Sequence, residues 1–347
     1  MQHYRPRFSI CIPAYNRAKF LEPLLLSIKN QDYRDYEIVI CEDNSPERKQ
    51  ISAEISRITT EFGVDVNYIE NERNLGYDGN IRNLISRARG QYCFFMGNDD
   101  IMAEGALCEV NRLIEKHPDV GFVLKSYAWF DKIADVINQE VRYFNEECYF
   151  PPSLNATALC FRRSGVISGF IVHRDSAYAV ATEQFDGTLY YQMHIASQVV
   201  STRGACFTPK ILVLCRNSEV PDFGASDSER GVYTPGVYTV AARLAMLGGI
   251  SKILDSAEAS GLKGLKPFVM RDYANYFYPY IRDQLHIPIG DYLTLYKGYI
   301  KLGYWRFPMF HLYFLVCRIL GAHYFDFLTR FLRNRIGRTV QIGNIFR

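Results

Sequence analysis

The sequence lacks the features of membrane-spanning and secreted proteins. Its 347 residues contain no run of eighteen uncharged apolar residues, which excludes a conventional membrane-spanning helix. The nine cysteines are odd in number and form no C-x-x-C pair, and Cys11, Cys41 and Cys93 lie inside apolar runs. They indicate small core side chains in a reducing compartment. The apolar stretch nearest the start, residues 8–14, is too short for a secretory signal, so we expect a cytoplasmic protein.

The glycine patterns of several nucleotide-binding enzymes are also missing. The sequence has no G-x-x-x-x-G-K-[ST] motif and no strand-linked G-x-G-x-x-G motif, which argues against kinases and dehydrogenases. A nucleotidyltransferase would carry a Gly-rich loop near its first strand, where this sequence has P-A-Y-N-R. The net charge of +3 is too small to predict a nucleic-acid partner. The apolar content of 48% is ample for a folded core, so disorder is excluded as the main state.

Basic residues concentrate at the end of the chain. Residues 297–347 contain nine Lys or Arg and one acid, Asp326, so this tail carries +8 and the remainder −5. The eleven residues between Arg306 and Arg318 are mostly apolar or aromatic. At a rise of about 1.5 Å per residue they cannot cross a hydrocarbon core about 30 Å thick, but they can lie in its interface. We expect the tail to contact an anionic membrane surface or, alternatively, to pack as a helical subdomain on the protein or on a second copy.

Strand and helix patterns alternate in the first 125 residues. Apolar, β-rich runs are separated by segments that repeat apolar residues at helical spacing. The predicted strands are 8–14, 37–41, 64–69, 92–96 and 120–125, and the predicted helices are 19–30, 47–62, 79–88 and 103–116. Nearly all-apolar strands alternating with helices predict an α/β fold with a mostly parallel sheet and helices on both faces.

The pattern weakens after residue 125. Residues 126–163 accumulate aromatic side chains without clear periodicity, which suggests an insertion or substrate-facing loops. Regular patterns return at 166–172, 188–200 and 211–215, and the polar segment 217–231 predicts a mobile connection. Beyond it the sequence predicts helices to the end. We therefore divide the chain into a domain at 1–220 and a helical region at 221–347.

Three predicted strands are each followed at once by a polar cluster. These clusters are Tyr15-Asn16-Arg17, Glu42-Asp43-Asn44-Ser45 and Asn98-Asp99-Asp100. In an open parallel sheet, ligands bind in the crevice outside the carboxyl ends of the strands. All three clusters are therefore expected to face one crevice.

The adjacent acids Asp99 and Asp100 suggest a cation site. Two neighbouring carboxylates repel each other, and oxygen ligands without His or Cys nearby favour Mg²⁺ or Mn²⁺ over zinc. The alternative is an N-cap for the following helix, and the same alternative holds for Asp43. Each cluster alone leaves both interpretations open.

The order and spacing of the motifs carry a stronger signal. An apolar strand followed by P-x-Y-N-R, then E-D-N-S, then N-x-G-x5-R-N-x4-A-x-G-x-Y, then a strand ending in N-D-D resembles the nucleotide-binding half of family 2 glycosyltransferases with the GT-A fold. The resemblance covers about residues 7–125 and continues more loosely to about Arg216. Within the family, S-I-C-I-P-x-Y-N-R, G-x-D-D, S-G-F-I-V-H-R and L-V-L-C-R are similar to the abequosyltransferase-like group of bacterial surface-polysaccharide biosynthesis.

The resemblance implies roles for individual residues of the donor site. Asp43 matches the acid that reads a pyrimidine base, Arg82 the arginine beside the diphosphate, and Asp99 and Asp100 the Mg²⁺ or Mn²⁺ motif. Gly97 replaces the leading acid of the common D-x-D-D form, which lowers the expected metal affinity. The residues implied to contact the nucleotide sugar are Pro13, Tyr15, Arg17, Asp43, Asn74, Arg82, Asn98, Asp99 and Arg216. The implied donor-binding half is 1–125, and the acceptor half is 126–220.

The chemistry implied by the resemblance is inverting sugar transfer. Asp186 is our first candidate for the general base and Glu183 the second, although either acid can instead cap the helix predicted at 188–200. Arg216 is expected to help neutralise the leaving diphosphate, with a surface arginine as the alternative. The donor is CDP-, UDP- or dTDP-linked, and the acceptor is a glycan, lipid-linked at the inner face of the cytoplasmic membrane. The competing hypothesis is a nucleotide-sugar-binding protein or inactive partner subunit without turnover.

Overall fold

The first four strands form the parallel sheet that the sequence predicted. We describe the fold from a computed structural model, which describes residues 4–217 and 222–336. Side by side in the order β3-β2-β1-β4 lie four parallel strands. Their bounds are β1 Phe8–Ala14, β2 Tyr36–Glu42, β3 Asn67–Glu70 and β4 Tyr92–Phe95. The carboxyl ends of these strands therefore lie at one edge of the sheet.

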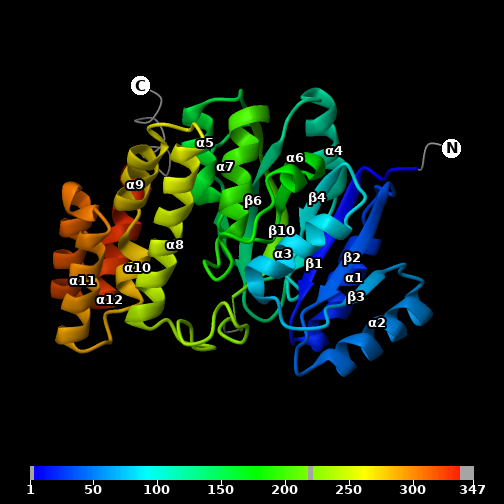
Figure 1. Cartoon of the computed structure of the whole chain (residues 1–347), viewed down its shortest axis with the longest axis horizontal. Helices are drawn as coiled ribbons and strands as arrows, with labels where there is room; N and C mark the ends of the chain where they lie inside the picture. Colours follow the sequence, from blue (N-terminus) through cyan, green and yellow to red (C-terminus); the bar gives the residue numbers. More distant parts are fainter. Residues whose placement is uncertain (1–3, 218–221, 337–347) are drawn as a thin grey trace.

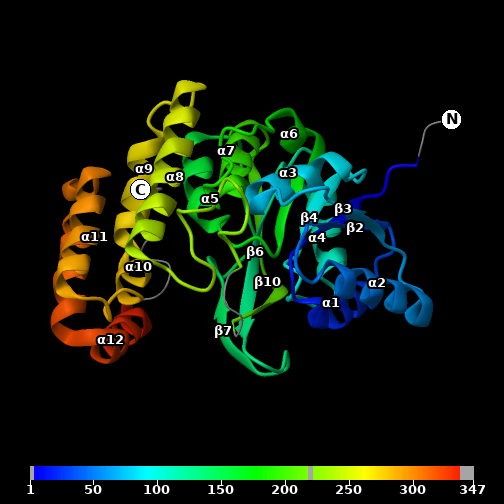
Figure 2. The ribbon, with the colours of Figure 1, turned by 60° about the horizontal axis from the view of Figure 1, so that its bottom comes forward.

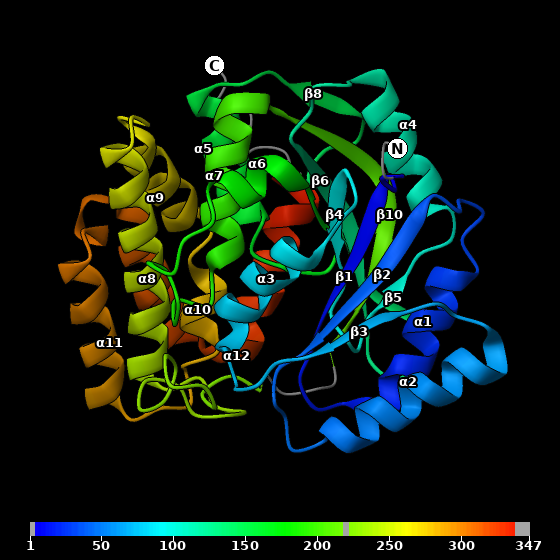
Figure 3. The same ribbon diagram turned by 45° about the vertical axis from the view of Figure 1, so that its right-hand side comes forward.

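Helices cover both faces of this parallel part because the strand residues alternate between two cores. Ile10 and Ile12 of β1 pack in a cluster with α1 (Leu21–Lys29), α2 (Arg48–Phe62) and α4 (Ala106–Lys116). Cys11 of the same strand packs in the other cluster, against α3 (Gly76–Arg87). Figure 3 shows α1 and α2 on one side of the strands and α3 on the other. The alternation explains why these strands are apolar on both faces.

Beyond β4 the sheet contains both parallel and antiparallel strand pairs. This corrects the expectation that the sheet is mostly parallel. β9 (Phe170–His173) pairs antiparallel with both β4 and β6 (Phe122–Phe130), whereas β10 (Ala205–Arg216) pairs parallel with β6. β5 (Ile101–Met102), which the sequence did not predict, pairs antiparallel with β10. The composition of a buried apolar strand is the same whether it runs parallel or antiparallel to its neighbours. The sequence therefore does not predict the direction of such a strand.

Residues 126–163 contain strands and a helix, where the sequence suggested an insertion or substrate-facing loops. β6 continues to Phe130, and β7 (Ile137–Val141), β8 (Cys148–Phe150) and α5 (Leu154–Arg163) follow it. The buried polar side chains of Lys125 and Ser126 interrupt the apolar pattern of β6. Both polar groups are satisfied, because Lys125 Nζ donates to the carbonyl of Val166 and Ser126 Oγ donates to that of Thr208. These carbonyl groups belong to residues that are distant in the sequence. The local pattern therefore could not show that Lys125 and Ser126 continue a buried strand.

From Val240 onward the described chain is mainly helical, in line with the helices predicted beyond residue 231, and this region packs beside the sheet (Figure 1). α6 and α7 lie between this region and the parallel strands. The helices are α6 Arg174–Ala179, α7 Tyr191–Arg203, α8 Val240–Ala259, α9 Leu265–Asn275, α10 Tyr278–Arg282, α11 Ile289–Lys301 and α12 Pro308–Ile336. One apolar cluster runs from the sheet through α7 into α8, α9 and α11. Of the helices in the described part of the chain, none combines the length and apolar character needed to cross a membrane.

Candidate active site

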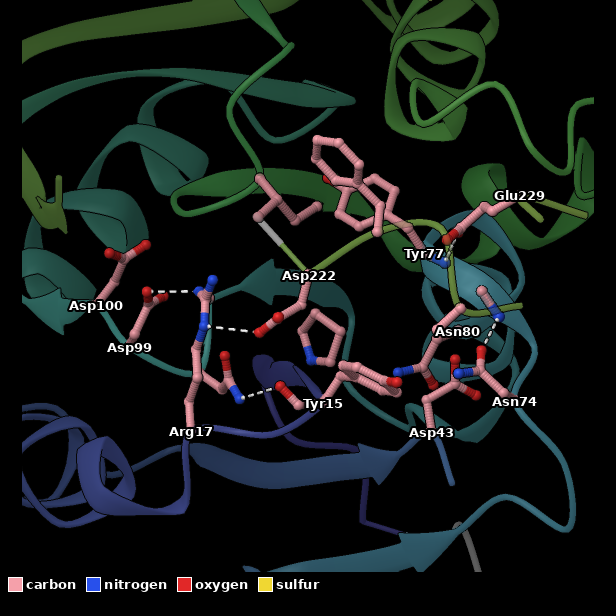
Figure 4. A pocket seen from close by; sticks show the side chains of 17 residues that line it. Tyr15, Arg17, Asp43, Asn74, Tyr77, Asn80, Asp99, Asp100, Asp222 and Glu229 are labelled. Carbon is pink, nitrogen blue, oxygen red and sulfur yellow. Dashed lines mark hydrogen bonds and ion pairs between the residues drawn. The ribbon is translucent and has the colours of Figure 1, made fainter. Parts of the chain in front are cut away.

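A pocket of about 260 Å³ lies at the carboxyl ends of the parallel strands (Figure 4). It brings together most of the donor-site residues suggested by the sequence. These are Pro13, Tyr15, Arg17, Asp43, Asn74, Asn98, Asp99 and Asp100. The clusters after β1, β2 and β4 therefore share one crevice. The resemblance implied that Asp43, Arg82 and Asp99 converge around one diphosphate. Asp43 and Asp99 share this pocket, whereas Arg82 is not among the residues that line it.

Asp43 follows β2 and is held rigidly at one end of the pocket. Its Oδ1 accepts hydrogen bonds of 2.8 Å from Asn71 Nδ2 and from the backbone N–H of Leu75. Asn71 in turn is fixed by side-chain amides of α3, since its Nδ2 donates to Asn80 and its Oδ1 accepts from Asn83. A carboxylate has about four acceptor positions, so capacity remains for a ligand. Burial raises the pKa of Asp43 to about 6, although the hydrogen bonds oppose this shift.

The loop after β1 is fixed to the loop after β4. Asn16 and Arg17 have φ angles of 53° and 65°, a left-handed conformation that is uncommon for residues other than glycine, although asparagine adopts it more readily than most. Asn98 Nδ2 donates to the carbonyl of Asn16 at 2.9 Å. The turn directs the Arg17 side chain back toward Asp99, where Nη1 lies 2.7 Å from Oδ2.

Asp100 is turned away from Arg17 and buried. Its Oδ1 accepts from the backbone N–H of Arg216 at 2.7 Å, and its Oδ2 accepts from the hydroxyl of Ser168. Burial, and secondarily the charge of Asp99, raise the pKa of Asp100 to about 7. Both neighbouring acids therefore line the pocket, but in different electrostatic environments.

Gly97 leaves room for the side chains of Asp100 and Ser168. A Cβ atom at residue 97 would lie 2.8 Å from Asp100 Oδ2 and 3.0 Å from Ser168 Oγ. An acid at this position, as in the common D-x-D-D form, does not fit beside Asp100 as it is placed here. The turn that carries Asp99 and Asp100 therefore packs differently from a turn that has an acid at residue 97.

The carboxylates offer a partial ligand set for a hard divalent cation. Asp99 and Asp100 supply oxygen atoms, the donor type that Mg²⁺ and Mn²⁺ prefer. Within residues 4–217 and 222–336, no group of three His, Cys, Asp or Glu side chains is placed to hold a metal by itself. The residues therefore fit a cation that takes its remaining ligands from a bound diphosphate and water.

The segment after β10 closes the pocket from the opposite side. Asp222 Oδ2 lies 3.3 Å from Arg17 Nε, and Glu229, which is buried, accepts from the backbone N–H groups of Tyr77 and Gly224 at 2.8 and 2.7 Å. Figure 4 shows Arg17 between Asp99 and Asp222, and Glu229 at the start of α3. In Figure 1, residues 222–239, which lead into α8, run along the bottom of the view. The sequence suggested a mobile connection at 217–231; within its described part, Asp222 and Glu229 contact Arg17 and the start of α3.

Several pocket residues were given no role from the sequence. They are Gly76, Tyr77, Asn80, Ile167, Asp222, Phe223, Ala225 and Glu229. The motif N-x-G-x5-R-N was the one available signal, since Gly76 is its glycine and Tyr77 and Asn80 stand at its unspecified positions.

Arg82 and the two candidate bases lie outside the pocket lining. Arg82 binds Asp186 through both Nη atoms, and its Nη2 lies 3.5 Å from Glu183 Oε1. α3 therefore presents Arg82 to the loop before α7 instead of to the donor pocket. The structure groups the three residues as an ion-pair cluster beside the pocket.

Arg216 contacts the turn formed by Asp99 and Asp100 from outside the pocket lining. Its Nε donates to the carbonyl of Asp99 at 3.1 Å, and its guanidinium lies over the rings of Phe20 and Phe130 at 4.2 and 4.6 Å. These contacts hold the side chain outside the pocket lining. Arg216 thus positions Asp99 and Asp100, and it is not a simple surface arginine.

Comparisons with known proteins bear on the family and the fold. The sequence profile described as Glycosyl transferase family 2 matches residues 9–176. The abequosyltransferase RfbV of Salmonella typhimurium is 28% identical over 219 residues, which are 60% of this chain and 66% of that protein. A GalNAc(5)-diNAcBac-PP-undecaprenol beta-1,3-glucosyltransferase of Campylobacter jejuni is 32% identical over 107 residues, 29% of this chain and 32% of that protein. The matches thus span less than two thirds of either relative.

Solved structures show the same fold at low sequence identity. The mannosyltransferase PcManGT from Pyrobaculum calidifontis, in complex with GDP-Man and Mn²⁺, has a TM-score of 0.52 and 16% identity over 91% of this chain and 88% of that chain. S. aureus TarS 1-349, in complex with UDP, has a TM-score of 0.50 and 15% identity over 91% of this chain and 92% of that chain. The GT-A-like fold predicted from the sequence is confirmed. Residues 9–176 of the chain form a glycosyltransferase family 2 domain.

Proposed function

We propose that the protein transfers a sugar, with inversion, from a pyrimidine nucleoside diphosphate sugar to a glycan acceptor. The observation that carries this proposal is the shared pocket of Asp43 and Asp99, which follow two strands separated by β1 alone. This pocket offers an acceptor for a base at one end and charged groups for a diphosphate at the other. Its position outside the carboxyl ends of parallel strands is typical of nucleotide sites in α/β folds.

Asp43 is proposed to read the pyrimidine. Uracil and thymine present a ring N–H and cytosine an amino group, and either donor can bond to a carboxylate. The amide network behind Asp43 holds the carboxylate in one orientation, which favours a defined base position. Tyr15 and Asn74 lie near Asp43 in Figure 4, Pro13 also lines the pocket, and these three residues are proposed to supply the surface on which the nucleoside packs. CDP-, UDP- and dTDP-linked donors all satisfy this chemistry.

The diphosphate is proposed to bind between Arg17 and the acids after β4. Asp99 and Asp100 would hold Mg²⁺ or Mn²⁺, which neutralises the charge of the leaving nucleoside diphosphate. Arg17 is placed to contribute a second positive charge, because its guanidinium already bonds to Asp99. The PcManGT structure, which has the same fold, contains Mn²⁺.

Asp186 remains our first candidate for the general base, with Glu183 as the second. Both lie before α7, beside the pocket and outside its lining, and both pair with Arg82. Arg82 holds the Asp186 carboxylate in one place, so it acts on the acceptor side in this proposal. The diphosphate role that the resemblance implied for Arg82 is less consistent with this pairing.

We propose a lipid-linked glycan acceptor and a site of action at the inner face of the cytoplasmic membrane. The name of the Campylobacter jejuni relative describes an undecaprenol-linked acceptor, and that of the Salmonella typhimurium relative describes transfer of abequose. Synthesis of an O-antigen or related surface polysaccharide is therefore the process we propose.

The deciding experiment measures release of free nucleoside diphosphate by the full chain. CDP-, UDP- and dTDP-sugars are supplied with Mn²⁺ or Mg²⁺, with and without an undecaprenol-linked glycan. We expect release that requires the cation and increases with acceptor. Tight nucleotide binding without release under any of these conditions would favour the alternative, a non-catalytic nucleotide-sugar-binding protein or inactive partner subunit.

The same assay tests the candidate base. Asp186→Asn should reduce turnover by about 10²-fold or more, the usual contribution of general base catalysis, while donor affinity changes little. Glu183→Gln is the matched variant. If both variants retain near-native turnover, another residue takes the proton.

A further inference from the structure

The helix α12 is apolar on two opposite sides. Between Pro308 and Leu320, only His311 and Arg318 are polar. One side packs into the protein through Phe310, Phe314 and Cys317. The other side presents a stripe at spacings of three and four residues, formed by Met309, Leu312, Leu315 and Ile319. These four side chains are 37–70% exposed, so large apolar groups face outward along more than two turns of helix.

Exposed aromatic side chains flank this stripe in the sequence. Trp305 precedes α12 and is 56% exposed. After the non-helical backbone at Gly321, Tyr324 and Phe327 are also exposed. We call Met309, Leu312, Leu315 and Ile319 the α12 face. A helix that borders water normally carries polar residues on its outer side, so the α12 face is suited to a further partner.

The surroundings of the α12 face are basic. Arg306 and Arg318 are exposed next to it, and Lys297 and Lys301 are exposed on the neighbouring α11. Asp326, the one acid between residues 297 and 347, is bound by both Nε and Nη2 of Arg282 at 2.6 Å. The Arg306 guanidinium lies 5.2 Å from the centre of the Trp305 ring. Apolar and aromatic groups bordered by Lys and Arg are the composition of helices that lie in a membrane interface.

We propose that the α12 face binds the surface of an anionic lipid bilayer, with the helix lying in the plane of the interface. In Figure 2, α12 forms the lower edge of the C-terminal helices, and the exposed fractions of Met309, Leu312, Leu315 and Ile319 show that their side chains face outward there. A second copy of the chain is a poorer occupant, because a symmetric contact through this face would bring Arg306 and Arg318 of both copies together. Lipid phosphates instead supply the opposite charge.

This inference rests on the proposed action at the membrane and names the surface that contacts it. Sedimentation of the full chain with phosphatidylcholine vesicles, with and without phosphatidylglycerol, measures binding in the absence of any donor. We expect binding to the anionic vesicles only, weakening as salt is raised. Because no turnover is involved, membrane binding and sugar transfer can fail independently.

Two variants separate the apolar and the charged contributions. Leu315→Glu with Ile319→Glu should reduce partitioning at least tenfold, because two charges enter the interface. Arg306→Ser with Arg318→Ser should weaken binding about fivefold per arginine and reduce its salt dependence. Tyr178→Glu on α6 is the matched control, since this exposed side chain lies away from α12 and should leave binding unchanged. Circular dichroism checks that each variant is folded.

Two results would overturn the proposal. One is the absence of binding to phosphatidylglycerol vesicles at low salt. The other is self-association, measured by analytical ultracentrifugation, that Leu315→Glu abolishes while vesicle binding persists in that variant. The second result would assign the α12 face to another copy of the chain.

Discussion

The guanidinium of Arg17 is bonded to the carboxylate of Asp99, with Nη1 and Oδ2 separated by 2.7 Å. The two residues follow neighbouring parallel strands, β1 and β4, and both line the pocket. The guanidinium therefore lies beside the same carboxylate oxygen atoms that would stabilise a metal cation bound to Asp99. Arginine and metal compete for one carboxylate in this arrangement, and a diphosphate is attracted to both.

Arg17→Ala should tighten the binding of Mn²⁺ in the absence of nucleotide. The variant removes a charge-assisted hydrogen bond that a cation must otherwise displace, and such a bond contributes about 1.5–3 kcal/mol, so we expect roughly a tenfold gain. Titration calorimetry with Mn²⁺ measures the change. Arg57→Ala is the control, because Arg57 pairs with acids of α1 and α2 away from the pocket. Unchanged or weaker Mn²⁺ binding in Arg17→Ala would mean that the cation does not use Asp99.

Asp43→Asn should weaken pyrimidine nucleotide binding by about 10- to 100-fold, the effect of losing a hydrogen bond to a charged acceptor. The fold should persist, because an asparagine Oδ1 can still accept from Asn71 and Leu75. In the wild type, affinity should rise as pH increases through about 6, where Asp43 ionises, and the variant should lose this dependence. CDP and UDP titrations across this range provide the measurement, with Glu70→Gln at the end of β3 as the control. Equal affinities of Asp43→Asn and wild type would remove Asp43 from the base site.

Asp100→Asn should stabilise the metal-free protein at high pH. The pKa of Asp100 is raised in the folded state to about 7, so this group favours folding below its unfolded pKa, and the contribution is lost as pH rises through about 7. An asparagine avoids this loss and can keep the contacts to Arg216 and Ser168. We expect similar stabilities near pH 4 and a difference of roughly 2–4 kcal/mol near pH 8, measured by urea unfolding.

Metal addition provides the second part of this test. Mn²⁺ should raise the stability of the wild type near pH 8 more than that of Asp100→Asn, because ligands that bind only the folded state stabilise it. Asp65→Asn, at an exposed loop position, is the control and should follow the wild type. A stability difference that is constant across the pH range would contradict the assigned pKa of Asp100.

The predictable part of the site is the part encoded next to each strand. Two of the pocket residues, Tyr15 and Asp43, directly follow β1 and β2, and Asp99 follows the turn at Gly97 after β4. The local pattern and the parallel order of the strands were therefore enough to predict that they lie together. Their family resemblance then identified the chemistry. The same locality accounts for the accurate bounds of β1 and the approximate bounds of β2 and α2.

The remaining part depends on contacts that local sequence does not encode. Glu229 reaches Tyr77 across 152 positions of the chain, and Arg82 reaches Asp186 across 104. The local sequence around a charged residue in a polar loop or on a helix surface is the same whether that residue is solvated or paired with a residue far away in the chain. Lys125 shows the reverse problem, since a lysine in a strand indicates exposure, yet this one is fully buried. Tertiary pairing decides all three cases.

Gly97→Ala should destabilise the protein by about 1–3 kcal/mol, because the added Cβ overpacks the turn. This atom would lie 2.8 Å from Asp100 Oδ2 and 3.0 Å from Ser168 Oγ, closer than side chains tolerate. Gly248→Ala in α8 is the matched control, since nothing lies within 4 Å of its Cβ, and there the helix should gain about 0.5–1 kcal/mol. For the same steric reason, Gly97→Asp should not restore tighter Mn²⁺ binding, although it recreates the common acidic motif. Thermal unfolding and Mn²⁺ titration of the three variants decide the matter. A stable Gly97→Asp with increased Mn²⁺ affinity would show that Asp100 is free to move away, and that the glycine limits metal binding only by lacking a carboxylate.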